Sequence, residues 1–272
     1  MFAARHTLAA SLFVLLAAGA ATLPARGDEA RPGETRPPVP VIGTPKLTIT
    51  TDSGATVGCR EQAAQPFLIR GNWFPRTSDA EKLKDGRKLL EDSIKYRTEK
   101  YGYFEGFGNP KANPHPPKFY AKSMTFMGMS VQVNERIMPA LKCVEAALKA
   151  GPAGSEYKPR AMGGIRFKNT YRGVEISNHV YGIAVDIEPD RNSCCGCVAP
   201  WPDNPLCKAK GKTIWERMAM PKSWVDTFER FGFYWLGHDV LQDTMHFEFL
   251  GDPDKVTEPV GPGAGAGAIA TP

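Results

Sequence analysis

The sequence predicts an α+β fold, because strand-like and helix-like apolar patterns both occur within one chain of 272 residues. Residues 184–187 and 245–249 alternate side chains of different polarity, as half-buried strands do. Residues 78–101 and 134–150 instead repeat apolar side chains at helical spacing. The length suits one sizeable domain with appendages, or at most two small domains.

The N-terminal residues are predicted to lie outside this domain. Residues 1–27 begin with the basic Arg5, continue with a mostly apolar run and close on small residues, which is typical of a secretory signal peptide. The run is too short for a comfortable membrane span, so we expect no stable span after cleavage; a retained anchor is the alternative. Residues 28–45, rich in Pro, Gly, Thr and Arg, are expected to form a disordered linker. We therefore expect a secreted or periplasmic protein.

The charge of the chain argues against nucleic acid as a partner. Loss of residues 1–27 would remove two of the 34 basic residues and none of the 29 acidic ones, which leaves a mild positive charge. Such a charge suits work near an anionic cell wall, whereas nucleic-acid binding calls for a clustered basic face. We expect no nucleic-acid partner.

The cysteines are predicted to form disulfides, because an even number of cysteines in an exported chain is typical of disulfide-bonded proteins. Six cysteines can pair in many ways, so the connectivity stays open. The alternative is that the cluster near residue 195 binds a second, structural metal, although it lacks two separated Cys-x-x-Cys pairs. The six are Cys59, Cys143, Cys194, Cys195, Cys197 and Cys207.

Residues 46–118 are expected to form an N-terminal extension that packs on the domain that follows. An alternating pattern at its start predicts a short strand. Ser78 is predicted to cap a helix, with Glu81 completing a capping box. The basic residues of this helix, Arg97 among them, are most simply its solvated side. Four prolines and two glycines predict a loop over residues 103–118.

The next segment is predicted to contain one strand and one helix. Residues 119–133 alternate apolar side chains and are predicted to form the strand. Asn134 is predicted to cap a helix that runs to Ala150. Pro139 lacks a backbone N–H, so we expect it to bend the first turns of this helix or to delay its start.

The C-terminal half is predicted to mix regular and irregular structure. A strand is expected over residues 162–167. The Cys-, Pro- and Gly-rich insertion 189–212 is expected to be irregular. Residues 214–230 are predicted to be helical, with an interruption or restart at Pro221. Residues 251–272 turn into Pro/Gly/Ala low complexity and are expected to form a flexible tail.

Residue types that ligate metals lie in or beside the two alternating segments. Two such strands side by side would bring His179, Asp186 and His246 together. Two imidazoles and one carboxylate, with a fourth position left for water, make an open Zn²⁺ site. The spacing differs from the helical His-Glu-x-x-His pattern of other zinc peptidases. The alternative is that the three are unrelated core and surface residues. His115 and His238 are expected to take no part.

The motifs of this region resemble those of a known family. They are Ser177-x-His179-x-x-Gly182-x-Ala184-x-Asp186, a Gly-Phe-x-Trp segment at 232–235 and Asp243-x-x-His246-Phe247-Glu248. In this order they resemble the zinc D-alanyl-D-alanine carboxypeptidases and the phage endolysin L-alanyl-D-glutamate peptidases, over about residues 125–250. The resemblance implies a hedgehog-like peptidase fold, in which a small antiparallel sheet is flanked by helices. We place this zinc peptidase domain at residues 119–250.

The resemblance also implies roles for individual residues. The three candidate ligands would hold zinc, and Asp243 would be the general base that takes a proton from water. An arginine upstream of the first motif would bind substrate and stabilise developing negative charge. Arg166 is the first choice because it lies on a predicted strand, whereas Arg172 is closer to the motif. Ser177 and Glu248 are expected either to support the site or to be structural.

These expectations predict a zinc metallopeptidase that acts on peptidoglycan stem peptides. A D-alanyl-D-alanine carboxypeptidase is favoured, and an endopeptidase that cuts L-alanyl-D-glutamate or a cross-link is the first alternative. The second alternative is a zinc-stabilised cell-wall-binding module without turnover. The complete ligand set together with Asp243 argues against a binding module, because a structural zinc site needs no base.

Overall fold

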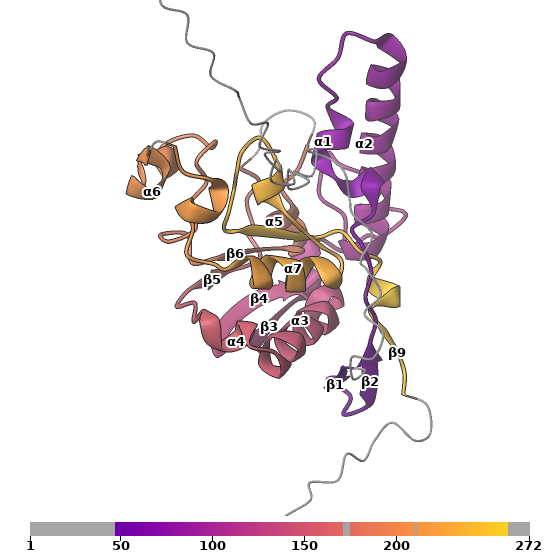
Figure 1. The fold of residues 1–272 in the computed structure, drawn as a ribbon. Helices are drawn as coiled ribbons and strands as arrows, with labels where there is room; N and C mark the ends of the chain where they lie inside the picture. The colour runs from indigo at the N-terminus through magenta and orange to yellow at the C-terminus, as the bar shows by residue number, and fades with distance from the viewer. Residues whose placement is uncertain (1–46, 171–174, 210, 261–272) are drawn as a thin grey trace, which may run out of the picture. The chain divides into compact units, whose positions relative to one another are not determined.

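The computed structural model describes residues 47–170, 175–209 and 211–260, which form strands and helices in one chain (Figure 1). Within these residues the strands make three small antiparallel sheets. The predicted α+β class is therefore confirmed. The predicted signal peptide and linker, residues 1–27 and 28–45, lie outside the described residues. In the part of the chain that is described, no helix is both long and apolar enough to cross a membrane.

A four-stranded sheet carries the candidate site. Its strands, in spatial order, are β5 (Met162–Gly163), β6 (Ala184–Ile187), β8 (His246–Phe249) and β7 (Phe233–Trp235). Strands β6 and β8 form the middle of the sheet, and all of their residues are buried. Their antiparallel register places Asp186 opposite His246 and Ala184 opposite Glu248.

The strand predicted over residues 162–167 is shorter in the structure, where pairing with β6 ends at Gly163. The chain then turns away from β6, and the backbone N–H of Ile165 donates to the carbonyl of Gln132 at 2.8 Å. Arg166 therefore lies beyond the strand and not on it.

Residues 119–133 were predicted to form one strand, and this prediction is wrong: they belong to a hairpin of β3 (Ala121–Phe126) and β4 (Met129–Asn134). The turn consists of Met127 and Gly128, whose φ values of 48° and 84° are both left-handed. Buried residues alternate within each strand, at Met124 and Phe126 in β3 and at Val131 and Val133 in β4, so the alternation shifts by one residue at the turn.

Helix α3 (Met138–Ala150) lies against this hairpin (Figure 1) and follows the 3-10 turn η3 (Glu135–Ile137). The predicted cap is confirmed, because the Asn134 side chain accepts a hydrogen bond from the Arg136 N–H at 3.1 Å. Pro139 lies in the first turn of α3, and the α-helix begins later than the cap, as expected.

Helix α7 (Lys222–Arg230) begins directly after Pro221, which confirms the predicted interruption. Its Trp224 and Phe228 are fully buried, and the ring of Phe228 stacks on that of Phe247 with centroids 4.3 Å apart. This contact joins α7 to β8. The other short helices are η1 (Pro66–Leu68), η2 (Pro117–Tyr120), α4 (Ala153–Glu156), α5 (Asn178–Tyr181), η4 (Trp201–Asp203), α6 (Pro205–Lys208), η5 (Ile214–Arg217), η6 (Leu236–His238) and η7 (Pro253–Lys255).

A second sheet joins the two ends of the described chain. Its strands, in spatial order, are β1 (Thr48–Thr50), β2 (Thr56–Cys59) and β9 (Thr257–Pro259). The flexible tail was predicted to begin at Gly251, and this is wrong for residues 251–260, because β9 pairs with β2 and Val256 is buried. A strand of this length has too few residues to show a periodic pattern. Residues 261–272 lie outside the described residues.

Helix α2 (Ala80–Tyr101) packs on the short helix α1 (Arg70–Trp73). Its cap is Asp79 and not the predicted Ser78, since the Asp79 carboxylate accepts two backbone N–H hydrogen bonds at 3.0 and 3.2 Å. Gly86 allows the close approach of the two helices, because a Cβ at this position would lie 2.6 Å from a carbonyl oxygen of α1.

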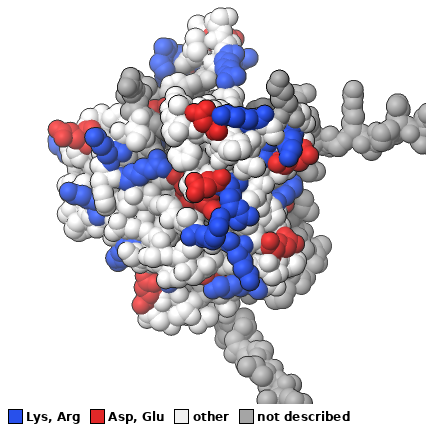
Figure 2. Space-filling model, turned by 90° about the vertical axis from the view of Figure 1, so that its left-hand side faces the viewer, with Lys and Arg blue, Asp and Glu red and all other residues white. Residues whose placement is uncertain are grey.

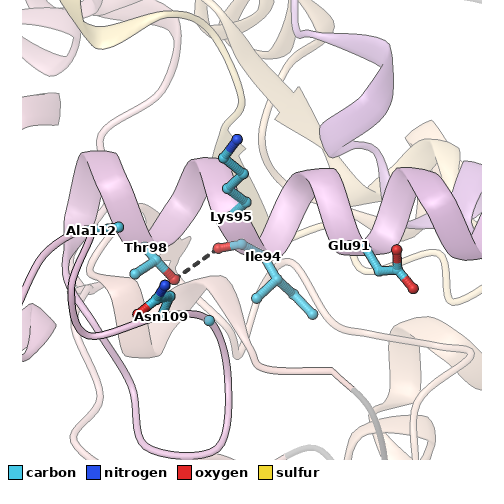
Figure 3. A pocket seen from close by; sticks show the side chains of 7 residues that line it. Glu91, Ile94, Lys95, Thr98, Asn109 and Ala112 are labelled. Atoms are coloured by element: carbon cyan, nitrogen blue, oxygen red, sulfur yellow. Dashed lines mark hydrogen bonds between the residues drawn. The ribbon is translucent and has the colours of Figure 1, made fainter.

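A surface hollow of about 320 Å³ lies between α2 and the loop that contains Gly108 (Figure 3). Inside it, the Thr98 hydroxyl donates to the carbonyl of Ile94 at 2.8 Å. Residue 108 must be glycine, because a Cβ there would lie 2.0 Å from the Thr98 hydroxyl oxygen. The residues that line the hollow include no candidate site residue; they are Glu91, Ile94, Lys95, Thr98, Gly108, Asn109 and Ala112.

All six cysteines form disulfides. This confirms the prediction of disulfides and excludes the alternative that the cysteine cluster near residue 195 binds a second metal. Cys59–Cys143 joins β2 to α3, whereas the other two bonds lie within the insertion. These are Cys194–Cys197 and Cys195–Cys207.

Candidate metal centre

His179 lies on α5, a single helical turn that precedes β6. Ser177 caps this turn, because its hydroxyl accepts a hydrogen bond from the His179 N–H at 3.3 Å. Gly182 ends the turn with a left-handed φ of 69°, and a Cβ there would lie 2.8 Å from the backbone nitrogen of Asn134. The Ser-x-His-x-x-Gly spacing thus encodes the turn that holds His179.

The structure brings the three predicted ligands together. Asp186 and His246 face each other across the β6–β8 pair, and Nδ1 of His246 lies 2.9 Å from Oδ1 of Asp186. Nε2 of His179 lies 3.1 Å from Nδ1 of His246 and 3.2 Å from Oδ2 of Asp186. All three residues are buried, and their ligand atoms lie within 4.8 Å of one another.

The ring nitrogen of each histidine that faces away from this cluster has its own acceptor. Nδ1 of His179 lies 2.7 Å from the carbonyl oxygen of Gly164, and Nε2 of His246 lies 3.1 Å from Oε1 of Glu248. Carbonyl and carboxylate oxygens only accept, so these outer nitrogens donate their hydrogen bonds. In the metal-free protein the inner nitrogens face the carboxylate of Asp186. A metal would replace the inner protons while the outer hydrogen bonds are kept, as in histidines that ligate metals.

Burial and hydrogen bonding oppose each other in the pKa values of the cluster. Burial raises the pKa of Asp186, but hydrogen bonds from both imidazoles outweigh it and hold that pKa well below its usual value. Burial lowers the pKa of His179. Burial acts in the same direction on His246, but hydrogen bonds to Asp186 and Glu248 raise its pKa to about 10. The cluster therefore favours a positive charge, which a divalent cation also supplies.

Asp243 lies on the loop that leads into β8. Its N–H donates to the carbonyl of Leu236 at 3.3 Å, and its backbone forms an isolated β-bridge with Cys194. Among the described residues, the buried Oδ1 of its carboxylate has no hydrogen-bond partner. Burial raises the pKa of Asp243 to about 6, with the charge of His246 opposing the increase. This carboxylate therefore exchanges a proton near neutral pH.

Arg166 lies at the edge of the cluster. Its backbone N–H donates to the carbonyl of His179 at 2.9 Å, and its guanidinium forms an ion pair with Asp186. The side chain is 44% exposed, so it contacts both a candidate ligand and solvent. Arg172 lies outside the described residues, so the choice between the two arginines stays a prediction.

The donor set fits zinc. Two imidazole nitrogens and one carboxylate oxygen match the catalytic zinc sites that use three protein ligands. The outer nitrogens of both histidines are hydrogen-bonded in the way that such sites require. His179, Asp186 and His246 are therefore the residues that would hold the ion.

A second group of ligand atoms belongs to Cys194, Cys197 and Asp243, which also lie within 4.8 Å of one another. The two sulfur atoms form one disulfide, so neither is available as the thiolate that a metal binds. Within the described residues, the first cluster is the one whose ligand set is intact.

The remaining described histidines lie outside the cluster, as expected. His115 is on an exposed loop, where its ring stacks on Phe119 with centroids 4.1 Å apart. His238 pairs with Glu229 at 2.8 Å.

Two residues connected to the centre were missed by the sequence reasoning. Asn178 hydrogen-bonds to Glu248, and Arg97 donates to Oδ1 of Asn178 at 3.0 Å. Arg97 was assigned to the solvated side of its helix, and this is wrong, because it is 1% exposed. Its spacing from Leu90 and Tyr101 places it on the buried stripe of α2, and this was the one signal that the sequence offered.

Residues 171–249 match a family model described as D-alanyl-D-alanine carboxypeptidase. Over this segment, the resemblance predicted from the motifs is confirmed. The match contains all three candidate ligands and Asp243, whereas Arg166 and helix α2 precede it. No curated protein and no solved structure gives a significant match to the chain.

Proposed function

We propose that this protein is a zinc-dependent D-alanyl-D-alanine carboxypeptidase that removes the terminal D-alanine from peptidoglycan stem peptides. The observation that carries the proposal is the convergence of three buried ligand side chains near Asp243. The charges of two of them, His246 and Asp186, affect the pKa of Asp243. Asp243 is a buried carboxylate of raised pKa, which a purely structural zinc site does not need. The family match over residues 171–249 supports the substrate class.

Metal binding and proton transfer fall to different residues in this proposal. His179, Asp186 and His246 hold the metal. Zinc, when bound, polarises the scissile carbonyl and lowers the pKa of water to about 7. Asp243 takes the proton of the attacking water and passes it to the amino group of the leaving D-alanine. Its pKa of about 6 suits both transfers, because one carboxyl group has to accept the proton and then release it.

Arg166 is proposed to bind the substrate. A stem peptide that ends in D-alanine carries a terminal carboxylate, which a planar guanidinium binds through two parallel hydrogen bonds. The Arg166 side chain is half-exposed at the edge of the cluster, so it can turn from Asp186 towards a substrate without leaving the site. The same position suits the stabilisation of negative charge that develops on the scissile carbonyl oxygen.

The expected location and partners agree with other features of the chain. The three disulfides support a secreted or periplasmic protein, because such bonds persist in oxidising compartments. On the face shown in Figure 2, acidic and basic side chains both occur, and several basic side chains border an acidic group. A mixed face of this kind suits a small charged peptide rather than a polyanion.

The proposal is tested by the release of D-alanine from a pentapeptide stem peptide. We expect the zinc-loaded protein to release it, a chelator to stop the release, and added zinc to restore it. Cleavage into two peptide fragments would instead establish an endopeptidase. If the protein binds about one zinc ion but cleaves neither stem peptides nor whole sacculi, it is a non-catalytic wall-binding module and the proposal is wrong.

A further inference from the structure

Arg97 is a charged side chain in the interior of the protein. It lies on α2, outside the matched segment 171–249, and is 1% exposed. Its guanidinium lies between two aromatic rings, 4.9 Å from the centroid of Trp73 and 5.0 Å from that of Tyr181. Burial of a guanidinium is costly unless its N–H groups are hydrogen-bonded, so the identity of its partners matters.

The guanidinium contacts the oxygen end of the Asn178 side-chain amide. Its Nη1 donates to Oδ1 of Asn178 at 3.0 Å and to the carbonyl of Ile176 at 3.2 Å. A guanidinium has no acceptor, so this contact fixes which end of the amide faces Arg97. The NH₂ end is left to donate to Glu248, and this interaction with Asn178 contributes to lowering the pKa of the Glu248 carboxyl.

Glu248 in turn contacts His246. The Nε2 atom of His246 lies 3.1 Å from Oε1 of Glu248, and because a carboxylate oxygen only accepts, Nε2 is the donor in this hydrogen bond. The other ring nitrogen, Nδ1, faces Asp186 and His179. A series of contacts therefore runs from α2 through Asn178 and Glu248 to a candidate ligand, and each contact restrains the position of the next side chain.

We infer that Arg97 is a positioning residue, which acts through Asn178 and Glu248 to hold His246 with its Nδ1 atom presented to the metal. The inference rests on the proposed function, because it concerns the same metal site. It gives the N-terminal extension a part in the centre, since helix α2 supports a ligand that lies on β8.

If Arg97 had a purely structural role, its loss would change the stability of the protein but not its zinc affinity. Arg97 also joins α2 to α5 through Asn178, so a loss of stability would accompany either role. Zinc affinity separates them, because a residue that only holds the helix in place leaves the affinity of the folded protein unchanged. The affinity is measured by competition with a chromophoric chelator, without any need for substrate.

Three variants test the first part of the chain of hydrogen bonds. Arg97→Met keeps much of the length of the side chain but removes every donor, and we expect its zinc Kd to rise about 10-fold or more, within the 10–100-fold typical of outer partners. Arg97→Lys keeps the charge and one donor nitrogen, so we expect a smaller increase. The control Leu90→Ala shortens a buried apolar residue of the same helix and should lower stability while the zinc Kd stays at the wild-type value.

Asn178→Asp tests the second hydrogen bond while keeping an acceptor for Arg97. An aspartate at this position still accepts from Arg97 but cannot donate to Glu248, so the zinc Kd should rise as it does in Arg97→Met. If Arg97→Met does not fold, Asn178→Asp decides the matter. We also expect Arg97→Met and Glu248→Gln to be non-additive, the double variant losing less affinity than the two single losses combined, because both act on His246.

The outcomes distinguish this inference from the proposed function. If the wild-type protein binds zinc and folded Arg97→Met and Asn178→Asp bind it equally well, the inference is wrong and the proposed function stands. If the wild-type protein binds no zinc, the proposed function fails, and the inference fails with it.

Discussion

Two buried aspartates show how differently the two sides of the candidate centre are built. On the ligand side, formed by His179, Asp186 and His246, the carboxylate of Asp186 has hydrogen bonds from both histidines and an ion pair with Arg166. On the base side, formed by Asp243 and its loop, Oδ1 is buried without a partner among the described residues. Hydrogen bonds hold the pKa of Asp186 well below its usual value, whereas burial raises that of Asp243 to about 6.

The difference separates metal binding from catalysis. A carboxylate that stays ionised at every physiological pH suits a permanent ligand. A carboxylate near its midpoint suits a group that accepts and releases protons. The backbone supports follow the same division: the ligands lie on paired strands and a capped turn. The base side is held by the cysteine insertion, where the Ser193 carbonyl accepts from the Thr244 hydroxyl at 3.0 Å.

The largest effect is expected from a change on the ligand side. His246→Ala should abolish D-alanine release and weaken zinc binding by more than the 100-fold upper value for outer partners, because a direct ligand is lost. Zinc content after dialysis and D-alanine release measure the two effects. His238→Ala is the matched control, since this histidine lies outside the cluster and should leave both unchanged. Retention of zinc by His246→Ala would contradict the assignment of the ligand side.

A change on the base side should affect turnover alone. Asp243→Asn keeps the shape of the side chain but removes the proton acceptor, so kcat should fall about 10²- to 10⁴-fold. The zinc Kd should remain close to the wild-type value, because Asp243 is not among the three ligands. A large loss of zinc from this variant would show that the two sides are not separate.

The ligand side could be predicted from the sequence because its signals are local. Alternation in two strands places Asp186 and His246, and the Ser-x-His-x-x-Gly spacing encodes the capped turn of α5. The family motifs added Asp243. The raised pKa of this residue could not be predicted, since it depends on burial by segments that are distant in the sequence.

The errors share a physical cause, which is contact between distant segments. Strand β9 forms because the edge of β2 is available to it, and Arg97 is buried because Trp73 and Tyr181 enclose its guanidinium. Strand β9 is too short to show a periodic pattern, and for Arg97 the helical spacing from Leu90 and Tyr101 was the one signal. The missed turn at Met127 and Gly128 differs, because both of its signals, Gly128 and the shift of the alternation by one residue, are local in the sequence.

Arg166 pairs with Asp186 on the ligand side, and its charge also lowers the pKa of Asp243 on the base side, so we expect an intermediate effect. Arg166→Gln should lower kcat/KM about 100- to 1,000-fold, equivalent to roughly 2.7–4 kcal/mol, if its guanidinium stabilises developing negative charge. Steady-state kinetics on a pentapeptide measure this. Arg160→Gln is the control, because Arg160 pairs with Glu188 and not with the cluster. Equal activity in both variants would exclude Arg166 and transfer the role to Arg172.

The smallest expected effect is on stability, and here the substitution is expected to cause a gain and not a loss. The pKa of Asp243 rises from 3.8 to about 6 on folding, so its ionisation opposes folding above pH 6 and has no effect below pH 3.8. In the metal-free protein, Asp243→Asn should therefore raise the free energy of unfolding at pH 8, by at most about 3 kcal/mol. The gain should disappear as the pH falls towards 4. Urea unfolding at the two pH values tests this, and a variant less stable than the wild type at pH 8 would contradict it.

The most direct test of the division is the mass spectrum of a pentapeptide stem peptide after incubation with zinc-loaded wild-type and Asp243→Asn proteins of equal zinc content. The wild-type protein should shorten the peptide by one alanine residue, and the variant should leave it intact. An intact peptide with the wild-type protein, or equal shortening by both proteins, would contradict this division.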